Sequence, residues 1–413
     1  MVRGATGRFG YFAGPIRSHP VCLMSRILPT IVLAQFFCTS LWFAGNAIAP
    51  DIAAQFHLVP GFVATLTSAV QLGFISGTLA FALLAISDRF SPSRVFFVCA
   101  VLAALCNLGI NLSGLGQEGL LAFRFLTGFF LAGIYPVGMK IASDYYQSGL
   151  GKSLGFLVGA LVLGTAFPHL LRSLAAHLPW HYVTLATSGL AVLGGLALVL
   201  LVPDGPHRRA GQHLQLTAFL AGFRRPEFRA AAFGYFGHMW ELYTFWAFVP
   251  MLLAAYNTAH PEAGFRVPFL SFLIIGVGSL ACVGSGLLSQ RLGARPVAAA
   301  ALGLSGLCCL VSPLFLRGNS PDLLLGFLFF WGLVVVADSP LFSTLVAQNA
   351  PEATRGTSLT IVNCLGFALT IVSIQFTSFL AHFLQPHYLY MTLAIGPVLG
   401  LWGLFSGKDS EVN

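Results

Sequence analysis

Apolar runs of about 20 residues recur along almost the whole chain, and they limit its possible folds more than any other feature. A helix needs about 20 such residues to cross a bilayer. Only 8% of the residues are charged, against roughly 25% in soluble domains. The sequence therefore predicts an all-α integral membrane protein with twelve transmembrane helices. These helices are expected to start near Ile27, Phe62, Val95, Glu118, Leu150, Tyr182, Arg229, Val267, Pro296, Asp322, Arg355 and His387.

The net charge of +8 is interpreted as a sign of membrane topology rather than of nucleic-acid binding, because the basic residues are spread over loops instead of one patch. One alternating set of loops carries Arg89 and Arg94, Lys152, the group from Arg208 to Arg229, Arg291 and Arg295, Arg355 and Lys408. The opposite loops carry Arg172, Arg266 and Arg317. Since positive loops stay in the cytoplasm, we expect a multi-pass plasma (inner) membrane protein with both termini cytoplasmic.

A polar interruption divides the apolar runs into six and six. It contains turn residues at its start and a short surface helix is expected over 214–223. The first residues lack the apolar core of a secretory signal, and Met24 is an alternative start. The predicted organisation is a basic cytoplasmic leader (1–26), an N-terminal six-helix bundle (27–202), a cytoplasmic linker (203–228), a C-terminal six-helix bundle (229–406) and a cytoplasmic tail (407–413).

Two segments of the first half resemble two of the second at nearly one offset. "SDRFSPSRV" at 87–95 aligns with "SQRLGARPV" at 289–297, and "YPVGMKIASD" at 135–144 aligns with "SPLFSTLVAQ" at 339–348. The chain is therefore interpreted as an internal duplication of a six-helix unit.

The loop after the second run of each half resembles the Gly-x-x-x-Asp-Arg-x-Gly-Arg-Arg motif of the major facilitator superfamily. The first copy keeps Asp88, Arg89 and Arg94 but has Leu84 and Ser91 at the glycine positions. The second copy has Gly286, Arg291, Gly293 and Arg295, with Gln290 in place of the acid. Two copies in register carry more weight than one.

The fourth run adds "RFLTGFFLAG", in which Arg124, Gly128 and Ala132 fit a second motif of that superfamily. The resemblance covers the chain from about residue 27. It implies two six-helix bundles related by a pseudo-twofold axis, a central cavity, and a monomer that moves a small solute by alternating access. The fifth run lacks the Gly-Pro pair of many drug antiporters, and the second and eighth runs lack the arginines of nitrate carriers.

The resemblance also implies a cytoplasmic gate that closes in the outward-facing state. In the first half its residues are Asp88, Arg89, Arg94 and Asp144, and in the second they are Gln290, Arg291, Arg295 and Gln348. Because glutamines replace both acids of the second half, we expect a charged latch in the first half and hydrogen bonds in the second.

Ionisable residues within the runs are few, and such residues usually face a cavity or a partner. His238 and Glu241, in "FGHMWELYTFWAFVP", are three positions apart and therefore share a helix face. They are either a protonatable pair beside a watered cavity, able to titrate near neutral pH, or a structural hydrogen-bonded pair near the headgroups. The first interpretation places the proton here.

Three further ionisable residues are candidates for the substrate or proton path. Arg124 either binds backbone carbonyls, or it attracts an anionic substrate or changes the pKa of a nearby acid. The resemblance associates it with proton coupling. Asp338 precedes Pro340, where freed carbonyls could complete a site, or it caps a helix. His169, beside Pro168, is either a ligand or part of a proline kink.

The first run contributes Trp42 and Asn46 as candidate substrate contacts. They lie four positions apart, on one helix face, and the first and seventh runs are equivalent in a duplicated carrier. Aromatic residues in membrane helices are more often packing or interfacial residues.

The expected function is secondary active transport of a small solute, with protons as the coupling ion. The chain lacks a phosphate-binding loop, a cofactor motif, a metal cluster and a nucleophile with a base, so we expect no enzyme, no cofactor and no catalytic or metal-binding residues. The alternatives are an uncoupled facilitator, a drug or metabolite efflux pump, and a transporter-like sensor. Expected partners are the solute, protons and membrane lipids, without nucleic acid.

Overall fold

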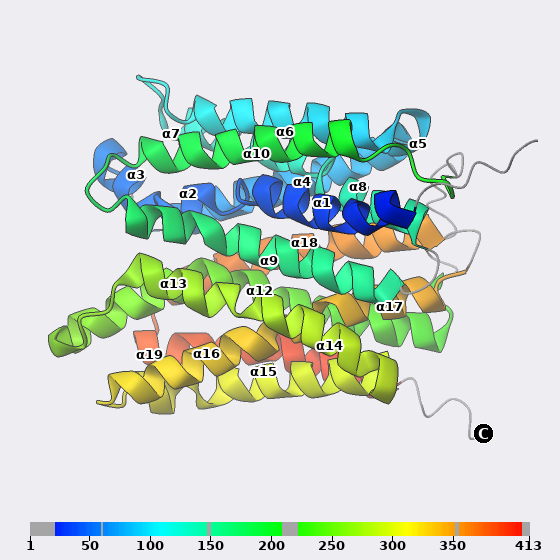
Figure 1. Cartoon of the computed structure of the whole chain (residues 1–413). Helices are drawn as coiled ribbons and strands as arrows, with labels where there is room; N and C mark the ends of the chain where they lie inside the picture. Colours follow the sequence, from blue (N-terminus) through cyan, green and yellow to red (C-terminus); the bar gives the residue numbers. More distant parts are fainter. Residues whose placement is uncertain (1–20, 59–60, 147–149, 209–221, 352–354, 407–413) are drawn as a thin grey trace, which may run out of the picture.

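The computed structural model describes residues 21–58, 61–146, 150–208, 222–351 and 355–406. This part of the chain consists of helices and connecting turns, without a strand. The long helices run roughly side by side (Figure 1). Ten helical segments of the described chain are long and apolar enough to cross a membrane. The remaining two predicted segments correspond to α1 (Val21–Thr39) with α2 (Ala44–Ala47) and to α12 (Pro226–Ala259), so the twelve predicted spans are consistent with the structure.

The first half starts with a helix that is interrupted at Ser40. Leucine, valine, alanine and phenylalanine dominate its long helices, as expected where side chains meet lipid or other helices. Its elements are α1 (Val21–Thr39), α2 (Ala44–Ala47), α3 (Ala49–Phe56), α4 (Phe62–Leu83), α5 (Ile86–Arg89), α6 (Pro92–Gly109), α7 (Gln117–Leu131), α8 (Tyr135–Tyr145), α9 (Leu150–Leu174) and α10 (His181–Leu201).

The second half repeats this arrangement and begins with the longest helix, of 34 residues. Its elements are α12 (Pro226–Ala259), η1 (Pro261–Ala263), α13 (Val267–Gly276), α14 (Gly278–Leu292), α15 (Ala294–Leu316), α16 (Pro321–Ala337), α17 (Ser339–Asn349), α18 (Arg355–Leu380), α19 (Pro386–Leu389), η3 (Tyr390–Ala394) and α20 (Ile395–Ser406).

The fourth and tenth spans are broken at equivalent places. In the first half the break lies between α7 and α8, just before Pro136. In the second it lies at Asp338, which ends α16 and precedes α17 and its Pro340. Proline lacks the N–H that a continuous helix needs, so both breaks follow from the sequence. Their matching positions agree with the predicted duplication.

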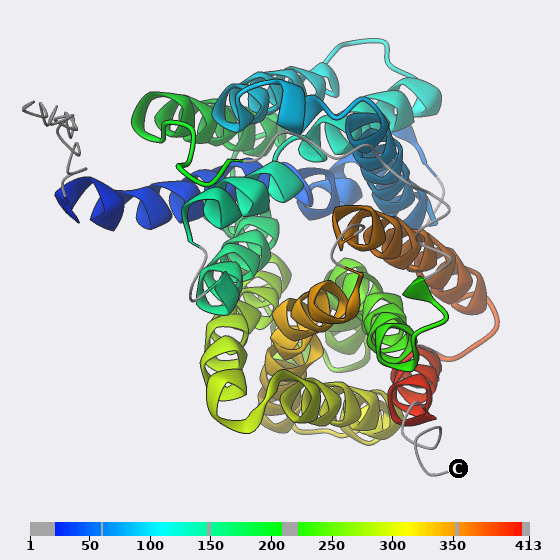
Figure 2. The same cartoon turned by 90° about the vertical axis from the view of Figure 1, so that its right-hand side faces the viewer.

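The two halves form separate groups of helices when the molecule is viewed along the helix axes (Figure 2). They meet where α4 packs against α18 and where α9 packs against α13 and α14. By the duplication these are equivalent pairs of helices. At the second contact Gly155 and Gly159 bring α9 close to the backbone of α14, because a Cβ atom there would lie 3.2 Å from the carbonyl oxygen of Cys282 and 3.1 Å from that of Ser279.

Both ends of the described chain lie at the same end of the molecule as α5 and the start of the linker (Figure 1). We call this end the linker side and the opposite end, with α3 and η1, the far side. Helix α1 begins at Val21, so residues 21–26, predicted as leader, are helical. The rest of the leader, residues 214–221 of the predicted surface helix and the tail 407–413 lie outside the described residues.

Candidate substrate cavity and buried polar residues

A cavity of about 820 Å³ lies between the two halves. This volume is within the range of about 300 to 1,000 Å³ typical of small-molecule sites. Helices α4, α8 and α9 of the first half and α12, α17 and α18 of the second contribute to its wall. Its aromatic lining residues are Phe81, Tyr135, Tyr146, Tyr235, Tyr243, Trp246 and Phe367. The resemblance predicted a central cavity. Of these residues, the sequence pointed only to Tyr235, Tyr243 and Trp246, as aromatic residues around His238 and Glu241 in the predicted seventh span.

The cavity extends to the linker side, where charged residues line its mouth. Lys140 Nζ lies 2.9 Å from Asp88 Oδ1 and 4.0 Å from Asp144 Oδ1. His207 and Arg355 also line this part of the cavity. All the acids that line the cavity within the described chain are therefore at its mouth, beside a lysine.

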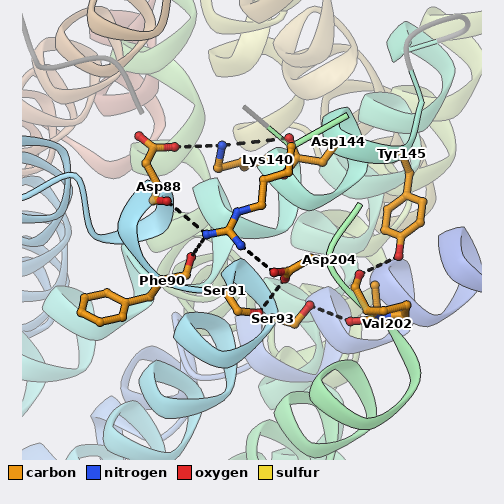
Figure 3. A network of polar contacts seen from close by, with 11 residues as sticks. Asp88, Phe90, Ser91, Ser93, Lys140, Asp144, Tyr145, Val202 and Asp204 are labelled. Atoms are coloured by element: carbon orange, nitrogen blue, oxygen red, sulfur yellow. Dashed lines mark hydrogen bonds and ion pairs between the residues drawn. The ribbon is translucent and has the colours of Figure 1, made fainter. Parts of the chain in front are cut away.

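The start of the linker is bound to the loop between α4 and α6 (Figure 3). Arg208 donates to the Asp204 carboxylate at 2.6 Å and to the carbonyl oxygens of Asp88 and Phe90 at 3.1 and 2.8 Å. Ser91 donates to Asp204 at 2.6 Å. These contacts fix residues 204–208 to the first half.

An aromatic cluster closes the other end of the cavity. The ring of Tyr243 lies 5.2 Å from those of Trp246 and Phe367, and the ring of Trp42 lies 5.6 Å from Phe367. The indole N–H of Trp42 donates to Gln71 Oε1 at 3.2 Å. Trp42, a predicted substrate contact, is thus buried behind the residues that line the cavity.

Helix α12 presents two different faces. Tyr235, Met239, Leu242, Tyr243 and Trp246 line the cavity, at the spacing of one helix face. His238 and Glu241 are buried and are not among the lining residues. The expectation that these two residues border a watered cavity is therefore wrong for this state, because their face turns toward the interior of the second half.

His238 pairs with an acid from the break between α16 and α17. Its Nδ1 atom lies 2.7 Å from Asp338 Oδ1, and both side chains are only 1% exposed. The fold thus brings together two of the predicted ionisable residues, His238 and Asp338. Removing one partner from such a buried pair leaves an uncompensated polar group and is costly.

Glu241 has partners of its own. It accepts hydrogen bonds from Trp331 Nε1 at 2.7 Å, Ser305 Oγ at 2.8 Å and Cys309 Sγ at 3.3 Å. The predicted pairing of His238 with Glu241 is therefore wrong, because the two side chains have separate partners. Trp331, Ser305 and Cys309 come from α15 and α16, and no local spacing in the sequence indicates that they meet Glu241.

Arg124 binds the backbone at the break in the first span. Its guanidinium donates to the carbonyl oxygen of Leu41 through both terminal nitrogens at 3.2 Å, to that of Trp42 at 2.6 Å, and to Asn107 Oδ1 at 3.2 Å. It is fully buried. Of the two predicted roles, this geometry fits the structural one, since an interrupted helix has carbonyls without helical partners.

Asn46 and His169 are buried but do not line the cavity. The Asn46 amide donates to Thr67 Oγ1 at 2.7 Å, within the first half. The Nε2 atom of His169 has no hydrogen-bond partner in the described chain. The structure therefore separates both residues from the cavity in this state.

The predicted gate residues are not assembled in this structure, in which the linker side is open. Arg89, Arg94, Gln290, Arg291 and Gln348 are exposed. The Arg295 guanidinium donates to the carbonyl oxygen of Leu404, within the second half. Of the gate residues, only Asp88 and Asp144 line the cavity. Their action in a closed state stays a prediction.

A family model described as Major Facilitator Superfamily matches residues 31–373 and 231–412. The chain belongs to the major facilitator superfamily. This is a family of membrane transporters, so this superfamily member is an integral membrane protein of a transporter family. The resemblance found in the loop motifs is thereby confirmed.

Similar proteins differ in what they carry. The niacin transporter NiaP of Acinetobacter baylyi is 28% identical over 207 residues, which are 44% of each chain, so the superfamily member spans less than half the length of this relative. The proton:xylose symporter XylE has a TM-score of 0.72 at 13% identity, with 93% of this chain and 96% of that chain covered. The human organic anion transporter MFSD10 has a TM-score of 0.68 at 14% identity, with 94% and 100% covered. At such identities the two structures show the shared fold.

Proposed function

We propose that this superfamily member is a proton-coupled secondary transporter that moves a small organic solute by alternating access. The cavity supports this function because both halves line it, it extends to the linker side, and aromatic residues close its other end. Rocking of one half against the other would expose the same residues to the far side. The equivalent contacts of α4 with α18 and of α9 with α13 and α14 are suitable sites for that motion.

The buried pair of His238 and Asp338 is the single observation that favours proton coupling. A carboxyl group and an imidazole 2.7 Å apart both bind protons and act as one coupled pair. Asp338 lies where α16 ends and α17 begins, between Val336 and Ser339, which line the cavity. A change in the charge of this pair would therefore act on the wall of the cavity. We assign the proton to this pair, and a supporting role to Glu241.

The topology of the proposed transporter follows from its charges. We place the linker side in the cytoplasm, because the arginine-rich loops predicted to be cytoplasmic lie there. The structure then corresponds to an inward-facing state of a protein of the plasma (inner) membrane. We further propose that it acts as a monomer, since each chain has its own cavity between its halves.

The names of similar proteins suggest the first solutes to test. Niacin is the solute of the relative NiaP, and xylose with protons is carried by the structural neighbour XylE. Both solutes are small organic molecules. Niacin is the first choice, because the match to NiaP is by sequence.

The proposed coupling can be tested in proteoliposomes with an imposed proton gradient. Wild type should accumulate solute, whereas Asp338→Asn should lose accumulation but keep exchange of labelled for unlabelled solute. Asp322→Asn, at an exposed position of α16, is the matched control and should behave as wild type. Accumulation by Asp338→Asn at the wild-type level would exclude the pair as the proton site.

An uncoupled facilitator is the second candidate, and one observation favours it. His238 and Asp338 do not line the cavity in this state, so protons could be irrelevant to the solute. A facilitator would equilibrate the solute without accumulation at any proton gradient, in wild type as well as in Asp338→Asn. An efflux pump would accumulate solute in inside-out vesicles only, and a sensor would move none.

A further inference from the structure

The deep part of the cavity has a chemical character that its mouth lacks. All the acids lining the cavity in the described residues, Asp88 and Asp144, are at the mouth. Deeper lining residues are aliphatic and aromatic, with a few amide and hydroxyl groups, among them those of Tyr135, Tyr243 and Asn363. Without a carboxylate, this region offers little to a cationic solute beyond the faces of its rings.

Hydrogen-bond donors without acceptors line this region. The indole N–H of Trp246 is buried and has no acceptor among the described residues, although Trp246 lines the cavity. The hydroxyl of Tyr235 donates to Asn363 Oδ1 at 2.7 Å, which occupies the amide oxygen and leaves the N–H₂ group of Asn363 for another acceptor. The hydroxyls of Tyr135 and Tyr243 also form no hydrogen bond within the described chain. A buried donor without an acceptor costs about 1 to 3 kcal/mol, so a solute with an acceptor would relieve the site at the Trp246 indole.

Aromatic rings flank the same donors. The rings of Tyr243 and Trp246 lie 5.2 Å apart at an interplanar angle of 66°, and that of Phe367 lies 5.2 Å from Tyr243. Ring faces and edges at such angles suit a flat ring in offset or edge-to-face contact. Together the donors and rings describe a site for a planar group with an acceptor attached.

We propose that the cavity binds a small aromatic monocarboxylate, with its ring beside Tyr243 and Phe367, its carboxylate bonded to the indole N–H of Trp246, and the amide of Asn363 in the same cavity wall. This substrate class rests on the proposed transport function. It also fits the proposed coupling, because one carboxylate carried with one proton moves no net charge across the membrane.

Equilibrium binding to the purified protein tests this substrate class without requiring transport. The probes are benzoate, its neutral analogue benzamide, the non-aromatic cyclohexanecarboxylate and the cation trimethylanilinium, each titrated by calorimetry. Benzoate should bind at least about tenfold more tightly than each of the other three, since a charge-assisted hydrogen bond contributes about 1.5 to 3 kcal/mol. Tightest binding of the cation, equal binding of cyclohexanecarboxylate, or no binding of benzoate would overturn the proposal.

Two variants test the assigned residues. Trp246→Phe keeps a ring but removes the N–H, and should weaken benzoate binding by about tenfold. Asn363→Asp keeps the shape but adds a negative charge, and should weaken it at least as much. The matched control is Trp402→Phe, at an exposed position of α20, which should bind as wild type. Unchanged benzoate binding by both cavity variants would overturn the assigned contacts.

The proposed function and the proposed substrate class fail in different experiments. Benzoate that binds with the expected selectivity but is not accumulated with protons would leave the site correct and the coupling wrong. Proton-driven accumulation of another solute, without benzoate binding, would leave the transport function correct and the substrate class wrong.

Discussion

His238 Nδ1 and Asp338 Oδ1 lie 2.7 Å apart, and they join the middle of α12 to the break between α16 and α17. Both side chains are almost completely buried. Neither residue indicates its partner in the sequence, since they belong to different spans. The pair therefore connects α12, which lines the cavity, to the break between α16 and α17, which also lies at the cavity wall.

Replacement of His238 tests whether the charge of this pair matters. His238→Gln keeps a hydrogen-bond donor but cannot bind a proton, so we expect its uptake to lose the stimulation by an imposed proton gradient. The measurement is initial uptake into proteoliposomes with and without that gradient. His260→Gln, at the far side, is the control. The same stimulation in His238→Gln as in wild type would assign the coupling to another group.

Replacement of Glu241 tests whether it acts independently of the pair of His238 and Asp338. Its carboxylate accepts three hydrogen bonds, so the N–H₂ group of a glutamine would meet donors. Glu241→Gln should therefore lower the free energy of unfolding by about 1 to 3 kcal/mol and keep the pH dependence of uptake. Thermal unfolding and uptake are measured on the same preparation, with Glu262→Gln, at an exposed site, as control. Lost pH dependence with normal stability would instead make Glu241 the proton site.

Replacement of Arg124 tests its structural role. Lysine keeps the charge but cannot bind the carbonyls of Leu41 and Trp42 with a planar fork. Arg124→Lys should lower the free energy of unfolding by about 1.5 to 3 kcal/mol, and the exposed Arg94→Lys should not. Chemical unfolding in detergent measures both. If Arg124→Lys is as stable as wild type but fails to accumulate solute, the arginine acts in coupling.

Replacement of Asp88 tests the predicted latch. In this open state Asp88 and Lys140 are partly exposed, so their attraction is worth only about 0 to 1 kcal/mol, and a closed gate would desolvate them. Asp88→Asn should therefore favour the linker-side-open state by about two- to fivefold. Labelling of a cysteine placed at Phe43, whose ring lies 6.3 Å from that of Trp246 in the aromatic cluster that closes the cavity, should fall.

Asp51→Asn is the control for the latch experiment, because it breaks an ion pair of the same length, 2.9 Å to Arg172, at the far side. It should leave the population of the linker-side-open state unchanged or raise labelling at Phe43. Unchanged labelling in Asp88→Asn would show that the charges at the mouth do not control the gate.

The fold was largely predictable, because length and hydropathy alone determine which segments can cross a bilayer. Pro136 and Pro340 also mark two helix breaks that the structure contains. The break after Thr39 has no proline, and it depends on Arg124, which binds carbonyls there from another helix. Such a contact between distant segments leaves no periodic signal in the sequence.

For the candidate site, the sequence singled out the ionisable residues within apolar runs as residues that face a cavity or a partner. It did not indicate their partners, because Glu241 meets Ser305 and Trp331, and His238 meets Asp338, only through the packing of helices. Tyr235 and Asn363, which line the cavity from α12 and α18, carry no local feature that distinguishes them from packing residues.

The two faces of α12 determine how far the proposed proton site lies from the solute in the cavity. Tyr235 and Met239 line the cavity, while His238, between them in the sequence, turns toward Asp338. A helix with its side chains is about 10 Å across. Movement of this one helix would therefore change the cavity wall and the pair of His238 and Asp338 at the same time. No chain of intermediate residues is needed to couple them.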